Sequence, residues 1–131
     1  MVRSDLERIR HIRQYCLDIS KTVKRSDSSF EIFSEDIDFY NSISMSIMQI
    51  GELVGGLSDE FKDTTRDKMP WGMIRGMRNH FAHGYATMEK NEIWETATAD
   101  IPNLLRFCEN IIEKVAKEHN KDKNPKDRDA R

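Results

Sequence analysis

Hydrophobic residues recur every three or four positions along most of this chain, the spacing that places them on one face of a helix. In the N-terminal part, this pattern predicts a helix over about residues 4–24, with a capping box at Ser4 and Glu7. A second long helix is expected from Asp36 or Asp38 to about residue 55. The apolar positions are Leu6, Ile9, Ile12, Cys16, Ile19 and Val23 in the first helix, and Phe39, Ile43, Ile47, Ile50 and Val54 in the second.

Shorter elements are expected between and after these two helices. Residues 27–29 break the pattern, and residues 30–33 can form one helical turn. Acidic residues follow a capping serine in a short helix over about 58–66. Pro70 is suited to the first turn of the next helix, which ends at Gly84.

The last predicted helix runs from about Glu89 to about Lys117. Pro102 is expected to kink or split it, because proline removes one backbone hydrogen bond. The following residues are almost all polar, so we expect a helical domain over 1–118 and a disordered tail over 119–131. The apolar seam of this helix is Trp94, Ala97, Ile101, Leu104, Cys108, Ile111 and Val115.

The fold class predicted from these elements is all-α, an antiparallel bundle of four or five helices. No stretch alternates as a strand does, no repeat is visible, and 131 residues fit one domain. Met45 and Met48 widen the apolar face of the second long helix, and Gly51 with Gly55 forms a groove of small residues. We therefore expect this helix to be covered on more than one side, in the bundle or in a dimer.

Composition limits the possible partners and compartments. The 21 Lys and Arg against 23 Asp and Glu leave a net charge of −2, so any nucleic acid must be bound by a local patch. Cys16 and Cys108 stand at apolar positions without a CxxC motif, which favours buried reduced thiols over a disulfide or a metal site. With no apolar N-terminal region and no run of about 20 apolar residues, we expect a soluble cytoplasmic protein.

Candidate chemistry is concentrated between Arg75 and Tyr85, at the end of a predicted helix. Steps of four residues place Arg75, Asn79 and His83 on one face, with Arg78 on the adjoining edge. A guanidinium holds phosphate by paired hydrogen bonds, and a nearby imidazole can transfer protons. These are the minimal groups for RNA cleavage without a metal.

Two plainer interpretations of these residues remain. The arginines can be solvated surface residues, with His83 favoured by the helix dipole. His80 and His83 can be read as half of a zinc site, but no acidic residue has ligand spacing and His11 and His119 are distant in sequence. A catalytic site would be incomplete in one chain, so a two-fold dimer is expected to supply the second acid or base.

The same residues resemble a known family signature. Arg78, His83 and Tyr85 form the R-x4-H-x-Y pattern of the HepT-like toxins, a branch of the HEPN superfamily. A second register from Arg75 to His80 has alanine where the tyrosine belongs. The resemblance extends over about residues 4 to 115 through Leu6 to Ile9, Ile50-Gly51-Glu52, Pro70-Trp71, Gly76 to Asn79, Glu92-Ile93-Trp94 and Asp100-Ile101-Pro102.

This resemblance implies an all-α homodimer that acts as a ribonuclease toxin without a metal or cofactor. Arg78 and His83 of both protomers would face one cleft, where they cleave RNA. Asn79 would orient the histidine or a phosphate. Arg75 and His80 are further candidates for binding or orienting the phosphate.

The resemblance also implies a partner, a nucleotidyltransferase antitoxin of the MNT type. In such families this antitoxin can transfer AMP from ATP to the motif tyrosine, here Tyr85. The added phosphate would bring negative charge beside Arg78 and His83 and compete with RNA. The alternative is a non-catalytic helical subunit that binds or regulates a nucleotidyltransferase. Glu52 matches a recurrent family position, with its role left open.

Overall fold

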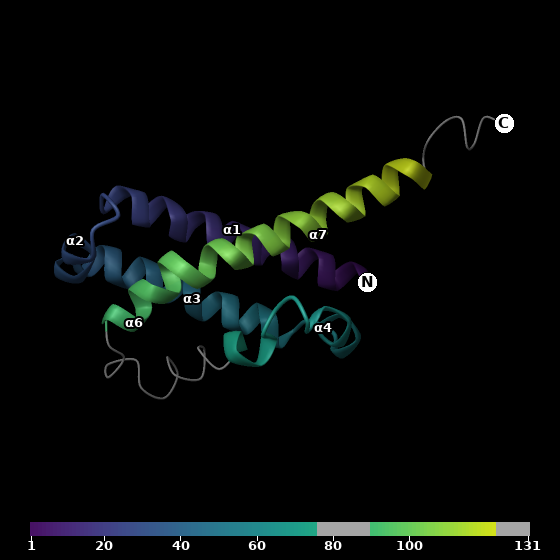
Figure 1. The fold of residues 1–131 in the computed structure, drawn as a ribbon, viewed down its shortest axis with the longest axis horizontal. Helices are drawn as coiled ribbons and strands as arrows, with labels where there is room; N and C mark the ends of the chain where they lie inside the picture. The colour runs from purple at the N-terminus through teal and green to yellow at the C-terminus, as the bar shows by residue number, and fades with distance from the viewer. Residues whose placement is uncertain (76–89, 123–131) are drawn as a thin grey trace.

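The computed structural model describes residues 1–75 and 90–122, and all the regular structure within these ranges is helical (Figure 1). This confirms the predicted all-α class. The elements are α1 (Arg3–Arg25), α2 (Phe30–Glu35), α3 (Ile37–Gly55), α4 (Asp59–Thr65), α6 (Lys90–Glu95), the π-helical stretch η2 (Thr96–Asp100) and α7 (Ile101–Asp122). Residues 71–75 are also helical.

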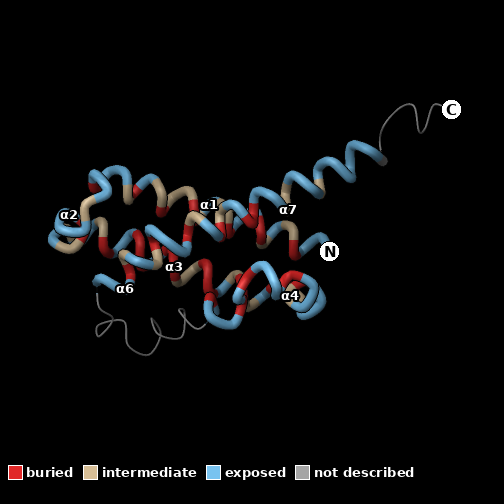
Figure 2. Tube along the Cα trace, in the orientation of Figure 1, coloured by how far each residue is buried: buried red, intermediate tan, exposed pale blue. Residues whose placement is uncertain are grey.

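Three long helices form the body of the molecule. Helix α1 packs against both α3 and α7 and runs antiparallel to each of them (Figure 1). Helix α2 joins α1 to α3 at one end, where it also contacts α6. The C-terminal part of α7 continues past the bundle, and its surface is exposed (Figure 2).

The predicted apolar stripes form the core of this bundle. Their central residues are almost inaccessible to solvent, as is Val54 at the end of the α3 stripe, and the other end residues are half-buried. Burial of this apolar surface is the main stabilising contribution. The core includes Ile9, Ile12, Cys16 and Ile19 of α1, Ile43, Ile47, Ile50 and Val54 of α3, and Ile101, Leu104 and Cys108 of α7.

The capping box predicted at Ser4 is wrong. Helix α1 begins after Val2, and no side chain caps it. Asp5 instead turns inward, with 1% of its surface exposed, and accepts hydrogen bonds from Ser58 N (2.8 Å) and Ser58 Oγ (2.6 Å). Ser58 in turn caps α4, so the first turn of α1 holds the start of a helix more than fifty residues away.

The other helix starts follow the sequence closely. The N-cap of α3 is Asp36, whose Oδ1 accepts from Asp38 N at 2.9 Å, which decides between the two candidates. The N-cap of α2 is Ser29. Before it, Asp27 and Ser28 have φ values of 57° and 54°, a left-handed conformation that terminates α1 at the predicted break.

The interruption expected at Pro102 appears one turn earlier, as the π-helical stretch η2. The Ile101 N–H bonds to the Thr96 carbonyl, five residues back instead of four. This wider turn changes the hydrogen-bond register just before the proline, where the N–H donor is missing. Beyond it, α7 runs to Asp122, further than the end expected near Lys117.

Both cysteines are buried free thiols, as predicted. Burial raises the pKa of Cys16 far above its usual range and the pKa of Cys108 to about 12, with the neighbouring Glu109 carboxylate adding to each shift. The reactive thiolate is therefore suppressed at neutral pH. These side chains serve as core residues.

Candidate functional site

The predicted motif residues Arg78, Asn79, His80, His83 and Tyr85 lie outside the described residues. Arg75 is the one predicted site residue that is described. The described residues nearest to the motif in the chain are those of the helical segment 71–75 on one side and Lys90 on the other.

The helical segment 71–75 leads directly into the motif, and aromatic packing anchors it. Trp71 is buried, and its Nε1 donates to Thr65 Oγ1 at 2.8 Å. The Trp71 ring meets Phe107 of α7 edge to face, with 5.3 Å between ring centroids, and packs against Phe61 of α4 at 6.0 Å. A buried indole with its N–H satisfied gives this segment a defined position.

Arg75 is exposed, but its guanidinium packs against the last turn of α3. Its Cζ and Nη1 atoms lie 3.4 Å from the point where a Cβ on Gly55 would stand. An arginine side chain therefore lies beside Gly55, one of the two glycines of the predicted groove. A cation beside the C-terminal end of a helix is favoured by the helix dipole. The phosphate-binding role of Arg75 stays a prediction.

Lys90, the first described residue after the motif, contacts the other end of α3. Its Nζ donates to the Ser34 carbonyl at 2.6 Å and lies 5.6 Å from the centroid of the Tyr40 ring. Arg75 and Lys90 thus bracket the motif in the chain, and they contact opposite ends of the same helix. Glu52 is exposed on α3 between those ends.

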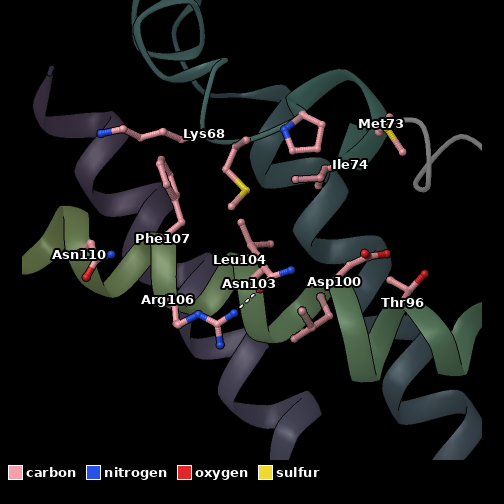
Figure 3. A pocket seen from close by; sticks show the side chains of 13 residues that line it. Lys68, Met73, Ile74, Thr96, Asp100, Asn103, Leu104, Arg106, Phe107 and Asn110 are labelled. Carbon is pink, nitrogen blue, oxygen red and sulfur yellow. Dashed lines mark hydrogen bonds between the residues drawn. The ribbon is translucent and has the colours of Figure 1, made fainter.

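A pocket of about 660 Å³ lies between residues 68–74 and the facing surface of η2 and α7 (Figure 3). Its floor is apolar and its rim is polar. The floor consists of Met69, Ile74, Ile101, Leu104 and Phe107, all buried, with Pro70 and Met73 at its edge. The rim consists of Lys68, Thr96, Asp100, Asn103, Arg106 and Asn110.

The rim of this pocket carries two cations, Lys68 and Arg106, and one carboxylate, Asp100. Arg106 Nη2 donates to Asn103 Oδ1 (Figure 3). Cations, amides and one carboxylate around an apolar floor can bind a ligand that is both anionic and partly apolar.

A sequence profile of the family described as "Ribonuclease HepT-like" matches residues 6–111 of the chain. That range includes most of α1, all of α3 and the complete R-x4-H-x-Y motif. The chain belongs to the HepT-like ribonuclease family.

The relatives agree with this assignment. A protein of Caldanaerobacter subterraneus subsp. tengcongensis named "Putative RNase" is 35% identical over 106 residues, which cover 81% of this HepT-like chain and 92% of the relative. Two proteins of Methanocaldococcus jannaschii carry the same description. They are 25% and 26% identical over 79% and 61% of this chain, covering 89% and 76% of their own lengths. No solved structure matches the chain significantly.

In residues 1–75 and 90–122, no group of three or more His, Cys, Asp or Glu side chains could hold a metal ion. No helix in the same residues has the length and apolar character needed to cross a bilayer.

The pocket is a site that sequence reasoning missed. Asn103, Arg106 and Asn110 are separated by three and four residues, a polar stripe that the sequence already contains. Such a stripe on an amphipathic helix normally faces solvent. Only the packing of residues 68–74 against α7 turns it into one wall of a pocket.

Proposed function

We propose that this HepT-like chain is a metal-independent endoribonuclease toxin, with an active site built from Arg78 and His83 of two protomers. The observation that carries the proposal is the family match over residues 6–111, which contains the whole R-x4-H-x-Y motif. The relatives named as RNases support the same activity.

The chemistry requires proton transfer at two oxygens and neutralisation of one phosphate. One His83 takes the proton of the RNA 2′-hydroxyl, whose oxygen attacks the adjacent phosphorus. The second His83 donates a proton to the departing 5′-oxygen. Arg78 from each protomer neutralises the non-bridging oxygens as negative charge increases. Asn79, Arg75 and His80 orient the imidazole or the phosphate.

A homodimer is part of this proposal because one chain offers only one complete motif register. A two-fold axis would bring two copies together with identical geometry. The exposed apolar side chain of Met45 on α3, with 55% of its surface accessible, supports a face that another chain covers.

Control of the toxin is assigned to an MNT-type nucleotidyltransferase antitoxin that adds AMP to Tyr85. The motif places Tyr85 two residues after His83. A phosphodiester there would compete electrostatically with the RNA phosphate. The position of the tyrosine within the family motif supports this assignment.

The proposal is tested by inducing wild type and His83→Ala in cells and by assaying the purified proteins on total RNA. We expect His83→Ala to lose at least about a hundredfold in cleavage rate, as is typical when a general acid or base is removed. His11→Ala is the matched control, because His11 is exposed on α1 and outside the motif. A folded, active His83→Ala protein would contradict the assignment.

A second arm of the same experiment adds an MNT-type nucleotidyltransferase and the variant Tyr85→Phe. We expect Tyr85→Phe to remain toxic in its presence, and mass spectrometry to find AMP-sized additions on the wild-type motif peptide alone. Wild-type protein that cleaves no RNA but forms a stable complex with the transferase would instead identify a regulatory subunit.

A further inference from the structure

The pocket beside residues 71–75 has the size and polarity of a site for a small ligand. Its volume of about 660 Å³ falls within the several hundred cubic ångströms of typical ligand pockets. Ile74, Leu104 and Phe107 provide an apolar floor that a flat aromatic ring can cover. Nucleobases bind such surfaces because each base has an apolar π face.

One wall of the pocket presents polar groups suited to the edge of a base. Asn103, Arg106 and Asn110 follow one face of α7, and Figure 3 shows all three around the pocket. The bond from Arg106 to Asn103 Oδ1 orients the Asn103 amide, so its NH₂ group is a donor for a ligand. Amide side chains pair with base edges through such donors and acceptors.

The charges on the rim favour a nucleotide over a protein surface. Lys68 belongs to the wall formed by residues 68–74 and Arg106 to the wall formed by α7, and a phosphate of the RNA can pair with the Arg106 guanidinium. A second protein chain would have to bury both cations and provide carboxylates for each, at a desolvation cost. The single carboxylate, Asp100, can accept from an exocyclic amino group of a base.

The π-helical stretch is an independent observation at the same place. Thr96 and Asp100, its first and last residues, both line the pocket. A π-helical turn changes the directions of side chains on a helix and occurs frequently at functional sites. Here it joins the polar stripe of α7 to two further polar groups on the same wall.

The chain also connects this pocket to the proposed catalytic motif. Ile74 precedes Arg78 by four residues, and even a fully extended chain of that length spans at most about 14 Å. We propose that the pocket binds one nucleotide of the RNA substrate, next to the cleaved phosphate, and prefers a base with an exocyclic amino group. This inference rests on the proposed ribonuclease function and adds a specificity site to it.

The first test is a methyl NMR titration of the full-length protein with CMP and with UMP, which lacks the amino group. We expect the methyl signals of Ile74, Ile101 and Leu104 to shift on titration. CMP should bind about tenfold more tightly than UMP, because one additional hydrogen bond changes the affinity by roughly that factor. Asp100→Asn should remove most of this preference, because its amide can donate to the uracil carbonyl.

The second test uses charge variants and RNA cleavage. Arg106→Gln should raise KM for RNA about tenfold and weaken both mononucleotides, with kcat little changed. Lys114→Gln is the matched control, since Lys114 is an exposed cation on α7 outside the pocket. Unchanged KM together with unshifted pocket methyls would overturn the inference, even if His83→Ala confirms the ribonuclease.

Two other outcomes separate this site from the proposed function. If wild type cleaves no RNA while CMP still shifts the pocket methyls, the nucleotide site is supported and the ribonuclease proposal fails. If Arg106→Gln converts a dimer to monomers in sedimentation, the pocket is covered by a second copy of the chain, and the inference is wrong.

Discussion

At the scale of single residues, Asp5 connects two distant parts of the fold. Its carboxylate is buried and accepts two hydrogen bonds from Ser58, one from the backbone and one from the hydroxyl. A carboxylate near the N-terminus of α4 is also favoured by the dipole of that helix. Since a buried charge without partners is costly, these contacts make its burial possible.

We predict that Asp5→Ala lowers the free energy of unfolding by about 1–3 kcal/mol, because it leaves the Ser58 N–H and hydroxyl without their acceptor. Chemical denaturation at fixed protein concentration measures the change. Asp63→Ala is the matched control, as Asp63 is exposed on α4 and should change stability by less than about 0.5 kcal/mol. Equal stability of Asp5→Ala and wild type would show that the Ser58 contacts contribute nothing net.

At the scale of elements, the C-terminal end of α3 is contacted by side chains from two other helical segments. The Arg75 guanidinium packs against Gly55, and the Arg8 guanidinium of α1 packs against Gly56. Both glycines leave room for an arginine at the negative end of the helix dipole. This arrangement links the segment that enters the motif to α3.

The two glycines should respond differently to an added methyl group. A Cβ at Gly55 would meet Arg75 at 3.4 Å, an ordinary contact, so Gly55→Ala should raise the free energy of unfolding by up to about 1 kcal/mol through helix propensity. At Gly56 the Cβ would lie 2.5 Å from Arg8 Nε, so that side chain must move and the gain should be smaller. Thermal or chemical unfolding measures both.

Gly72→Ala is the reference for these variants, because nothing lies within 4 Å of its Cβ position. A destabilised Gly55→Ala protein would mean that Arg75 cannot adjust even slightly. The contact between the Arg75 guanidinium and residue 55 would then be too tight to accept a methyl group.

At the scale of the whole molecule, α3 carries apolar side chains on more sides than the bundle covers. Ile43, Ile47 and Ile50 are buried in the bundle, while Met45 remains 55% exposed on another side. The sequence predicted that this helix would be covered twice. Within the described chain, the face that carries Met45 has no full cover, which fits the proposed dimer.

We predict that Met45→Glu shifts the protein from dimer toward monomer, because an interface would have to bury the new carboxylate without a partner. Sedimentation equilibrium over a range of concentrations measures the dissociation constant. The matched control is Thr64→Glu, an exposed position on α4. If both variants dimerise as wild type does, the second side of α3 is not the interface.

Local periodicity was sufficient to predict most helices and their core faces, because amphipathic spacing is written into neighbouring residues. The caps at Asp36 and Ser58 and the interruption near Pro102 were also predicted from neighbouring residues. The capping box at Ser4 failed because α1 begins at Arg3 with Val2 as its N-cap, which places Ser4 inside the first turn of the helix.

The sequence by itself determined the all-α class, the apolar stripes and the family motif, since all three depend on spacing along the chain. Only the tertiary structure decided that Asp5 holds Ser58, that Arg75 covers Gly55, and that residues 68–74 close a pocket over α7. These contacts join residues that are far apart in the chain. Their distances and directions follow from how the helices pack, which no local pattern specifies.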